Sequence, residues 1–389
     1  MRRFALNFVY TDDDDQWADM VRSVLPVVDL IVANDASPAG NLTKEMNNFL
    51  GDSQVPRYIF TRPFDDFGKS SQFALDKLRE VASSLAWDAE ETWGLSLKCN
   101  EVLMIDGSFS MEDVYRDLYF IEAKMNGKKV HYRFLFRLAR NFEWRGPVHE
   151  TLTWEGLDIV KRNINGIHIE QKEITDQEKQ LEKLKKEANL LTRFLEEGNN
   201  ELRWYSLTAQ TFFSIGKRLD QGAEQQYYFK QSLFFYEQLA KLFPDKQKDV
   251  FLAFVRIGML RESLGFPDLE TIEAYENAYS ICPGRGEPIK LMILYFMRKE
   301  NWSQALAYSQ FAFDTYFEKD PVPENETGDH SFYTWEILQY HYVICRYLRE
   351  HEKAKDALFK LTALTYLHPE YFTEEQIIVI NGYNAARIR

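Results

Sequence analysis

Cysteine is scarce in this sequence, and the cysteines present form no regular pattern. Cys99, Cys282 and Cys345 lie far apart in the chain, and no two of them have a Cys-x-x-Cys spacing. This distribution disfavours both a disulfide framework and a zinc finger. We therefore expect a protein of a reducing compartment and predict a cytoplasmic location.

Long apolar runs and an excess of basic charge are also missing. No uninterrupted apolar stretch reaches the roughly 18 to 20 residues that a membrane-spanning helix needs. The N-terminal MRRFALNFVY is followed at once by TDDDD, without a small-residue cleavage site, so we interpret it as a first strand rather than a signal peptide. The chain has 47 Lys and Arg against 60 Asp and Glu, and its net charge of -13 disfavours binding to nucleic acid.

Apolar residues are abundant, and their pattern changes near residue 170. The length of 389 residues favours two domains over one, and a hydrophobic content of 45% is ample for burial in globular domains. In residues 1–170, strand-length runs such as FALNFVY, VVDLIVAND and GLSLKCNEVL alternate with helical segments such as residues 69–87. This alternation predicts an α/β sheet whose strand ends and following loops form the edge that binds ligands.

Residues 171–389 are helical in pattern, rich in aromatic residues and internally repetitive. An aromatic residue, a smaller apolar residue and a helix-ending proline recur at the same offsets, in Tyr236, Leu239 and Pro244 and again in Tyr275, Ala278 and Pro283. Ala305 and Ala312 continue the small-residue pattern. These offsets resemble the tetratricopeptide repeat, in which paired helices stack into a solenoid. We therefore predict an all-α repeat domain whose aromatic residues form its core.

Four segments of the first half, taken in order, resemble glycosyltransferase family 2, the inverting enzymes with the GT-A fold. They are VYTDDDDQWADMVRSVLPVVDLIVANDAS, PFDDFGKSSQFAL, LSLKCNEVL and FLFRLARNFEWRGPVHETL, within residues 4–155. Further along, PGRGEP and NWSQAL resemble the repeat module appended to such enzymes, an arrangement also similar to bacterial peptide S-glycosyltransferases. The resemblance implies an α/β, Rossmann-like GT-A domain over residues 1–170 and an all-α, tetratricopeptide-repeat-like domain over residues 171–389.

Two functions of different classes follow from these patterns. The resemblance implies an inverting glycosyltransferase that moves a sugar from a nucleotide-sugar donor, expected to be a UDP-sugar, to a saccharide or peptide acceptor. The helical repeats would then hold the acceptor or pair two chains as a homodimer. The alternative is a catalytically silent interaction or scaffold protein, built on the repeats, with a degenerate transferase domain. The retained GPVHE segment favours the first function, and the altered LSLKCNEVL segment favours the second.

The resemblance assigns catalysis to the pair His149 and Glu150, with Glu150 as the base that takes the acceptor's proton. It implies donor binding by Asp35 and Asp66, and the strand end that carries Lys98, Asn100 and Glu101 is predicted to bind the donor as well. For Asp35 and Asp66, capping of a turn or helix is an equal alternative. Lys98 is expected to place its ammonium against a diphosphate, with an ordinary solvated lysine as the alternative.

Metal binding is the point where this sequence departs from the family. The family has Asp-x-Asp where this chain has Lys98-Cys99-Asn100, so a Mn²⁺ or Mg²⁺ cofactor is left in doubt. The remaining candidate ligands are Asn100, Glu101 and His149. The four aspartates at positions 12–15 lack the spacing of a calcium loop, and we interpret them as a cap for the helix that follows. Ordinary salt bridges are the expectation for Arg137, Arg140 and Arg145.

Overall fold

The computed structural model describes residues 2–11, 16–38, 40–51, 53–154, 161–172, 176–317 and 331–386, with residues 161–163 and 384–386 described by their backbone alone. The predicted cap at residues 12–15 lies outside the described residues. The chain forms two compact units, Met1–Gly198 and Asn199–Arg389. The predicted division between residues 170 and 171 stays a prediction about domains, and the structure adds that the helix following it belongs to the first unit.

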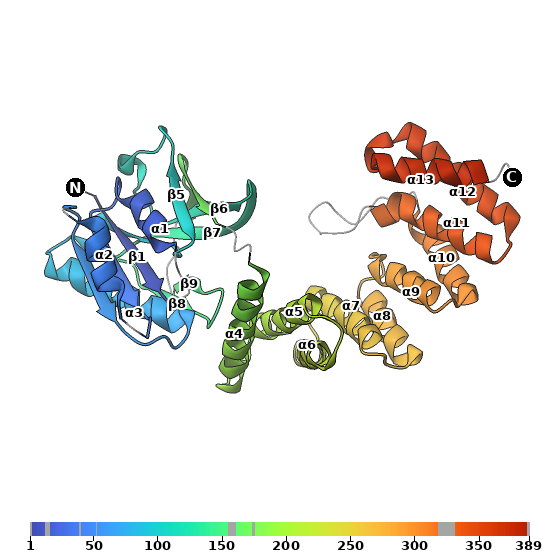
Figure 1. The fold of residues 1–389 in the computed structure, drawn as a ribbon, viewed down its shortest axis with the longest axis horizontal. Coiled ribbons are helices and arrows are strands. Elements are labelled where there is room, and N and C mark those ends of the chain that lie inside the picture. Colours follow the sequence, from blue (N-terminus) through green and yellow to red (C-terminus); the bar gives the residue numbers. More distant parts are fainter. Residues whose placement is uncertain are drawn as a thin grey trace. The chain divides into compact units, whose positions relative to one another are not determined.

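The first unit is built on one large mixed sheet (Figure 1). Its main path runs β3-β2-β1-β4-β7-β6-β11-β5, and β10 pairs with β6 beside this path. The strands are β1 Arg3–Tyr10, β2 Leu30–Asp35, β3 Arg57–Thr61, β4 Thr92–Ser96, β5 Glu101–Ile105, β6 Leu118–Met125, β7 Lys128–Arg137, β10 Lys161–Asn163 and β11 Ile167–Gln171. A separate two-stranded sheet joins β8 Phe142–Arg145 to β9 Thr151–Trp154.

Helices cover both faces of the large sheet. The helices of this unit are α1 Trp17–Val24, α2 Leu42–Leu50, α3 Phe67–Ser84 and α4 Gln177–Glu196. On one face, Met20 of α1 and Met46 of α2 pack into a fully buried core with strand residues such as Leu6. On the other face, Leu78 of α3 packs with Phe136 of β7 and with the small β8-β9 sheet. The parallel strands therefore end at an edge that α3 and its preceding loop border.

The predicted Rossmann-like GT-A sheet needs correction, because only part of the sheet is parallel. The neighbours β3, β2, β1 and β4 are parallel, but β7 joins β4 in the antiparallel sense and β6 pairs antiparallel with β7. A tight hairpin connects β6 to β7 through Asn126 and Gly127, whose φ angles of 52° and 73° are those of a two-residue hairpin turn. An Asn-Gly pair between strands is a strong sequence signal for such a hairpin, and the sequence analysis missed it.

The described part of the second unit is helical. Its helices are α5 Leu202–Arg218, α6 Ala223–Leu242, α7 Gln247–Ser263, α8 Asp268–Ile281, α9 Glu287–Arg298, α10 Trp302–Tyr316, α11 Ile337–Tyr347, α12 His351–Leu367 and α13 Glu374–Ala386 (Figure 1). Consecutive helices pack as pairs, α5 with α6, α7 with α8, α9 with α10 and α11 with α12. The prediction of paired helices after residue 170 is therefore confirmed for these residues.

Glycines set how closely two of these pairs approach. A Cβ atom on Gly216 of α5 would lie 2.5 Å from the ring of Phe229 on α6. A Cβ atom on Gly258 of α7 would lie 2.3 Å from the ring of Tyr275 on α8. Because real Cβ atoms do not come so close to a ring, the same Gly-aromatic contact fixes the packing of both pairs. Tyr275 is fully buried, as the repeat pattern predicted.

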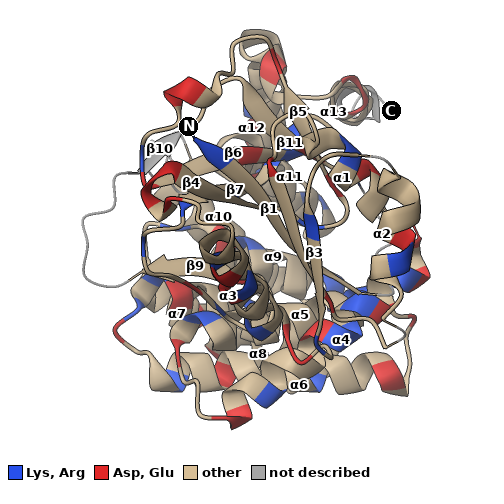
Figure 2. Ribbon diagram, turned by 90° about the vertical axis from the view of Figure 1, so that its left-hand side faces the viewer, with Lys and Arg blue, Asp and Glu red and all other residues tan. Residues whose placement is uncertain are grey.

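Charge of both signs is spread along these elements. Figure 2 shows segments bearing Lys and Arg interspersed with segments bearing Asp and Glu. No helix in the described ranges is both long enough and apolar enough to cross a membrane.

Candidate functional site

Lys98, Cys99 and Asn100 form the turn between β4 and β5, and Glu101 holds this turn in place. The Glu101 side chain is completely buried. Its carboxylate accepts hydrogen bonds from Arg133 Nε at 2.7 and 2.8 Å and from the Lys98 backbone N–H at 2.8 Å, and it lies 2.9 Å from His131 Nε2. Burial raises the pKa of Glu101, but the Arg133 charge and these hydrogen bonds outweigh it and lower the pKa to about 2.

A second contact joins Lys98 to Glu150, two residues that are far apart in the sequence. Lys98 Nζ lies 3.8 Å from Glu150 Oε1 and 5.7 Å from the centre of the Phe67 ring. The Glu150 side chain is only 7% exposed, and its Oε2 is buried without a hydrogen-bond partner. Burial raises the pKa of Glu150, yet the nearby Lys98 and Arg133 charges hold it below its ordinary value. The structure thus brings together one predicted donor residue and the predicted base.

The start of α3 positions the loop that carries Glu150. The Phe67 backbone N–H donates to the Pro147 carbonyl at 3.0 Å. Gly68 allows this approach, because a Cβ atom there would lie 2.3 Å from the Gly146 carbonyl oxygen. His149 follows in the left-handed region, with a φ of 49°, and its side chain is 55% exposed. Its Nε2 lies 4.0 Å from Glu187 of α4, so His149 points to that helix rather than to Lys98.

Asp35 and Asp66 both cap helices, as the capping alternative predicted. Asp35 accepts hydrogen bonds from Ser37 Oγ at 2.5 Å and from the Leu42 backbone N–H, at the start of α2, at 2.9 Å. Asp66 accepts a hydrogen bond from the Lys69 backbone N–H in the first turn of α3 at 2.7 Å. These bonds give both side chains a structural role, whereas donor binding by them stays an untested prediction.

The residues predicted as metal ligands do not fit a metal ion. Glu101 is bonded to Arg133, and the Asn100 amide donates to the Lys172 carbonyl oxygen at 3.2 Å. His149 contacts α4 instead of these two residues. Within the described ranges, no three His, Cys, Asp or Glu side chains gather in a way that would hold a metal ion. Use of Mn²⁺ or Mg²⁺ by this protein stays a prediction.

The arginines predicted to form ordinary salt bridges do so. Arg137 and Arg140 both pair with Glu90, at 3.0 and 2.9 Å, and with Asp117, at 3.4 and 2.9 Å. Arg145 pairs with Glu143 at 3.3 Å. The prediction is confirmed for all three side chains.

Two residues that the sequence analysis did not select are central to this edge. Arg133 on β7 is the main partner of Glu101, and it stands among apolar neighbours in the strand sequence HYRFLFR. A buried charge on a strand was the available signal, because such a charge needs a partner. Asn34 at the end of β2 is fully buried, and both its amide atoms lack a hydrogen-bond partner. No sequence pattern marked it.

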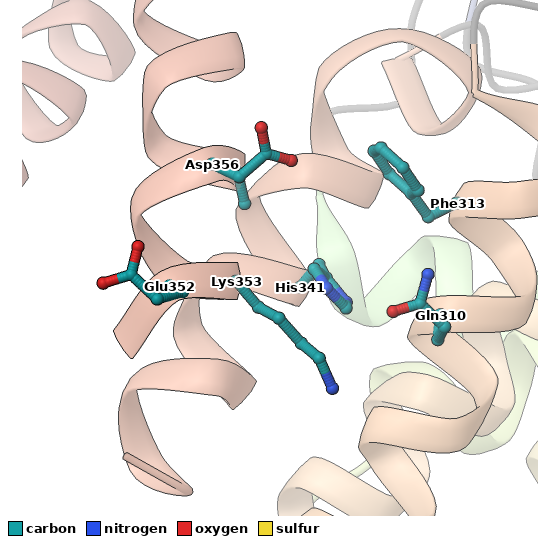
Figure 3. Close-up of a pocket in the computed structure, with 7 residues that line it drawn as sticks. Gln310, Phe313, His341, Glu352, Lys353 and Asp356 are labelled. Carbon is teal, nitrogen blue, oxygen red and sulfur yellow. The ribbon is translucent and has the colours of Figure 1, made fainter. Parts of the chain in front are cut away.

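A pocket in the second unit offers a different kind of site. It has a volume of about 250 Å³ and lies between α10, α11 and α12. Its lining residues come from three helices: Gln310 and Phe313 of α10, His341 of α11, and Glu352, Lys353, Asp356 and Ala357 of α12. Figure 3 shows Gln310 and Phe313 on one side, the charged residues of α12 on the other and His341 between them.

Neighbouring residues contact the base of this pocket on several sides. His341 is 5% exposed, its Nδ1 lies 3.0 Å from Ser309 Oγ, and its Nε2 lies 3.6 Å from Cys345 Sγ. Burial lowers the pKa of His341, so the ring is neutral near pH 7. Phe313 stacks on the ring with a centroid distance of 5.9 Å. The base is therefore preformed and uncharged.

The charges around the pocket are unequally paired. Lys355 pairs with Glu352, and Lys360 pairs with Asp356 at 2.8 Å, so both carboxylates of the pocket have close cations. Lys353 is 3.8 Å from Glu350 and half exposed. Among the charged side chains of the pocket, Lys353 therefore has the most distant ion-pair partner. The pocket suits a carboxylate of a ligand better than a cation.

No protein-family model matches this chain, and no curated protein matches it. Solved structures do match, and each spans about half of the chain. MamA residues 41 to the end from Desulfovibrio magneticus RS-1 is 16% identical, with a TM-score of 0.30, over 50% of this chain and 99% of that one. A tetratricopeptide repeat protein from Parabacteroides merdae is 12% identical, with a TM-score of 0.33, over 55% and 73%.

YrrB, described as a tetratricopeptide repeat protein with an unusual peptide-binding site, is 14% identical, with a TM-score of 0.28, over 50% of this chain and 95% of that one. Likenesses of this size transfer neither an activity nor a ligand. None of these three structures is a glycosyltransferase, and no family or curated match supplies one. The predicted membership of glycosyltransferase family 2, the GT-A fold, the UDP-sugar donor and hexosyl transfer are therefore corrected. Of the two functions predicted from sequence, the interaction protein built on helical repeats is retained.

Proposed function

We propose that this chain is a protein-interaction protein whose helical unit binds a peptide segment of a partner. The observation that carries the proposal is the pocket between α10, α11 and α12. Pockets for small-molecule ligands measure about 300 to 1,000 Å³, so a volume of about 250 Å³ suits a single amino-acid side chain better than a whole cofactor. The occupant is then one residue of a longer segment that lies across the neighbouring helices.

The chemistry of the pocket favours an acidic residue at this position. Phe313 and Ala357 offer apolar contact to the stem of a side chain, and Gln310 offers an amide. Lys353 supplies a positive charge whose own partner is 3.8 Å away, while Glu352 and Asp356 have closer cations. A Glu or Asp of the partner gains a charge-assisted hydrogen bond from Lys353.

Selection of random-sequence peptides on the full-length chain tests this proposal. We expect enrichment of peptides that carry Asp or Glu. A hydrogen bond to a charged group contributes about 1.5 to 3 kcal/mol, so Lys353→Glu is expected to weaken their binding by roughly 10- to 150-fold in fluorescence anisotropy. Lys217→Glu is the control, because Lys217 is exposed on α5 and is not among the residues that line the pocket.

Two results would contradict the proposal. One is a selection that enriches no peptide above an unrelated helical protein. The other is a set of peptides whose binding falls equally with Lys353→Glu and Lys217→Glu, because a general charge effect would then explain it. The proposal also includes the pairing of two copies through the helical unit, as predicted from the sequence.

We also propose a cytoplasmic location. The three cysteines are free thiols, and two of them, Cys99 and Cys345, are buried. Free thiols persist in a reducing compartment. Fractionation of the native host, with detection of the full-length chain in the soluble cytoplasmic fraction, is the expected result, and recovery outside that fraction would contradict it.

A further inference from the structure

The last two helices of the second unit expose large apolar side chains. On α12, Phe359, Tyr366 and Leu367 are 72%, 79% and 72% exposed, and on α13, Ile378 and Val379 are 69% and 46% exposed. We call these five residues the C-terminal apolar surface. Leu361 of α12 and Ile380 of α13 belong to one buried cluster, so α12 and α13 pack against each other. Exposed apolar patches of this kind mark interaction sites.

The stripes on α6 and α8 that are equivalent to the exposed stripe of α12 are not apolar throughout. Each of Pro244, Pro283 and Pro369 follows the second helix of a pair, and counting back from them aligns α6, α8 and α12. The stripe Phe359, Ala363 and Tyr366 of α12 corresponds to Glu273, Asn277 and Ser280 of α8, which are all polar. The same stripe of α6 is mixed: Phe234, Gln238 and Lys241. Only the α12 stripe is apolar throughout among these three.

The charges that flank the C-terminal apolar surface are divided between its two ends. Residues 346–360, towards the start of α12, contain five Lys or Arg and three Asp or Glu. Residues 361–386 contain three acidic residues, Glu370, Glu374 and Glu375, and no Lys or Arg; Arg387 and Arg389 follow them in the sequence and lie outside the described residues. When two such surfaces meet about a two-fold axis with their α12 helices antiparallel, the basic residues at the start of α12 in each copy face Glu370, Glu374 and Glu375 of the other.

We infer that the C-terminal apolar surface is the contact by which two copies of this chain form a two-fold symmetric dimer. A second copy satisfies both features at once, because it covers apolar side chains with apolar side chains and matches opposite charges. The inference gives a surface to the proposed pairing of two copies. It does not depend on peptide binding, because the pocket at Lys353 and the C-terminal apolar surface are made of different residues.

The dimer is tested by light scattering and sedimentation of the full-length chain between about 1 and 100 μM, the range in which weak interfaces saturate. The expected mass rises to twice the 46.0 kDa of one chain. Phe359→Glu and Tyr366→Glu are expected to keep the protein monomeric over this range, because each buries a charge in the contact. Phe234→Glu is the matched control: Phe234 is 51% exposed at the position equivalent to Phe359, and its variant is expected to dimerise like the wild type. Unchanged circular dichroism shows that each variant is folded.

Charge reversal tests the two-fold arrangement. Lys355 lies one turn before Phe359, and Glu375 lies one turn before Ile378 and Val379. We expect Lys355→Glu and Glu375→Lys each to weaken the dimer by about 5- to 10-fold and the double variant to recover most of that loss. A wild-type chain that stays monomeric at all concentrations would overturn the inference, as would a dimer that Phe359→Glu and Phe234→Glu weaken equally. Loss in the double variant at least as large as in the single variants would overturn the antiparallel two-fold contact. None of these results depends on whether peptides bind at Lys353.

Discussion

Glu101 illustrates how a residue that suggests a ligand site from sequence can be structural. It follows a strand-like run, where a carboxylate is expected to meet ligands, but its partner Arg133 is 32 positions away on β7. The antiparallel pairing of β4 with β7, in which Ser96 lies opposite Phe134, places Arg133 beside the turn that ends at Glu101. Sequence could therefore predict an ionisable residue at the strand end but not the buried ion pair that occupies it.

Because the folded-state pKa of Glu101 is about 2, below its ordinary value of 4.5, its ionised form stabilises the fold. This stabilisation is complete above the unfolded-state pKa near 4.5 and is lost as the pH falls towards 2. The pKa difference corresponds to about 3 kcal/mol. We expect the free energy of unfolding of the wild type, measured with urea, to fall as the pH falls over this range. The same free energy in the Glu101→Gln variant is expected to depend less on pH. Glu45→Gln, on an exposed site of α2, is the control, and equal slopes for the two variants would disprove this role for Glu101.

Lys98 is predicted to control the ionisation of Glu150. Its ammonium is 3.8 Å from the nearly buried Glu150 carboxylate and lowers the pKa of that group. Without this charge, the effect of burial, which raises the pKa, is less strongly opposed. We expect Lys98→Met to raise the pKa of Glu150. Carbon-13 NMR of the Glu carboxyl groups measures this pKa, and the Glu150→Gln variant assigns the Glu150 signal. Lys172→Met, which removes the partner of Asp19, is the comparison. A Glu150 titration that is the same in both lysine variants would show that Lys98 does not act on it.

At the scale of elements, the helix and strand patterns were predictable and their connections were not. The helix predicted at residues 69–87 is α3, and the run FALNFVY lies within β1. The mixed order of the sheet was missed, because hydrophobic periodicity reports which residues are buried but not which strands become neighbours. The Asn126-Gly127 turn was the one local signal that pointed to the antiparallel part.

The cap of α3 gives a prediction at this scale. Asp66 bonds the Lys69 backbone N–H, whereas Asn41, at the same position before α2, makes no side-chain cap bond. Loss of an N-cap bond costs about 1 kcal/mol, so Asp66→Ala is expected to lower the free energy of unfolding by about that amount. Asn41→Ala is expected to change it little. Denaturant unfolding measures both variants, and equal losses would mean that the cap bond has no separate effect.

The packing of α7 on α8 gives a second prediction at the scale of elements. Alanine in a helix is normally more stable than glycine by about 1 kcal/mol. At Gly258 the added methyl group meets the ring of buried Tyr275 at 2.3 Å, and such overpacking costs about 1 to 3 kcal/mol. We expect Gly258→Ala to destabilise the protein and Gly382→Ala to stabilise it, because nothing lies within 4 Å of a Cβ atom at Gly382. Thermal unfolding measures the change in melting temperature of each variant. A change in the same direction for Gly258→Ala and Gly382→Ala would refute the packing argument.

At the scale of the whole molecule, the strands of the large sheet end by Gln171 and the paired helices begin at Leu202, whereas the division at residue 170 stays a prediction about domains because α4 belongs to the first unit. The glycosyltransferase prediction went wrong at the same scale, because short motifs spread over residues 4–155 were taken to identify a family. Motifs such as GPVHE specify local turns and contacts, here the approach of Gly146 and Pro147 to α3. Local contacts of this kind do not determine which reaction, if any, a whole domain performs.

The two compact units predict that stability is local to each of them. Asp66→Ala is expected to speed backbone hydrogen exchange within residues 1–198 and to leave residues 199–389 nearly unchanged. Gly258→Ala is expected to do the reverse. Mass spectrometry of peptic fragments reports both units in one experiment. Faster exchange throughout the chain in either variant would show that the units unfold together.

Because cysteine is scarce, the native thiols can be used to measure local unfolding of the protein. Cys99 is buried in the β4-β5 turn of the first unit, and Cys345 is buried beside His341 in the second unit. A thiol-specific alkylating reagent can reach either sulfur only while the surrounding structure is open, so the two labelling rates measure the opening of each unit separately. No probe needs to be introduced. Cys282, which is less buried, provides the fast reference in the same chain.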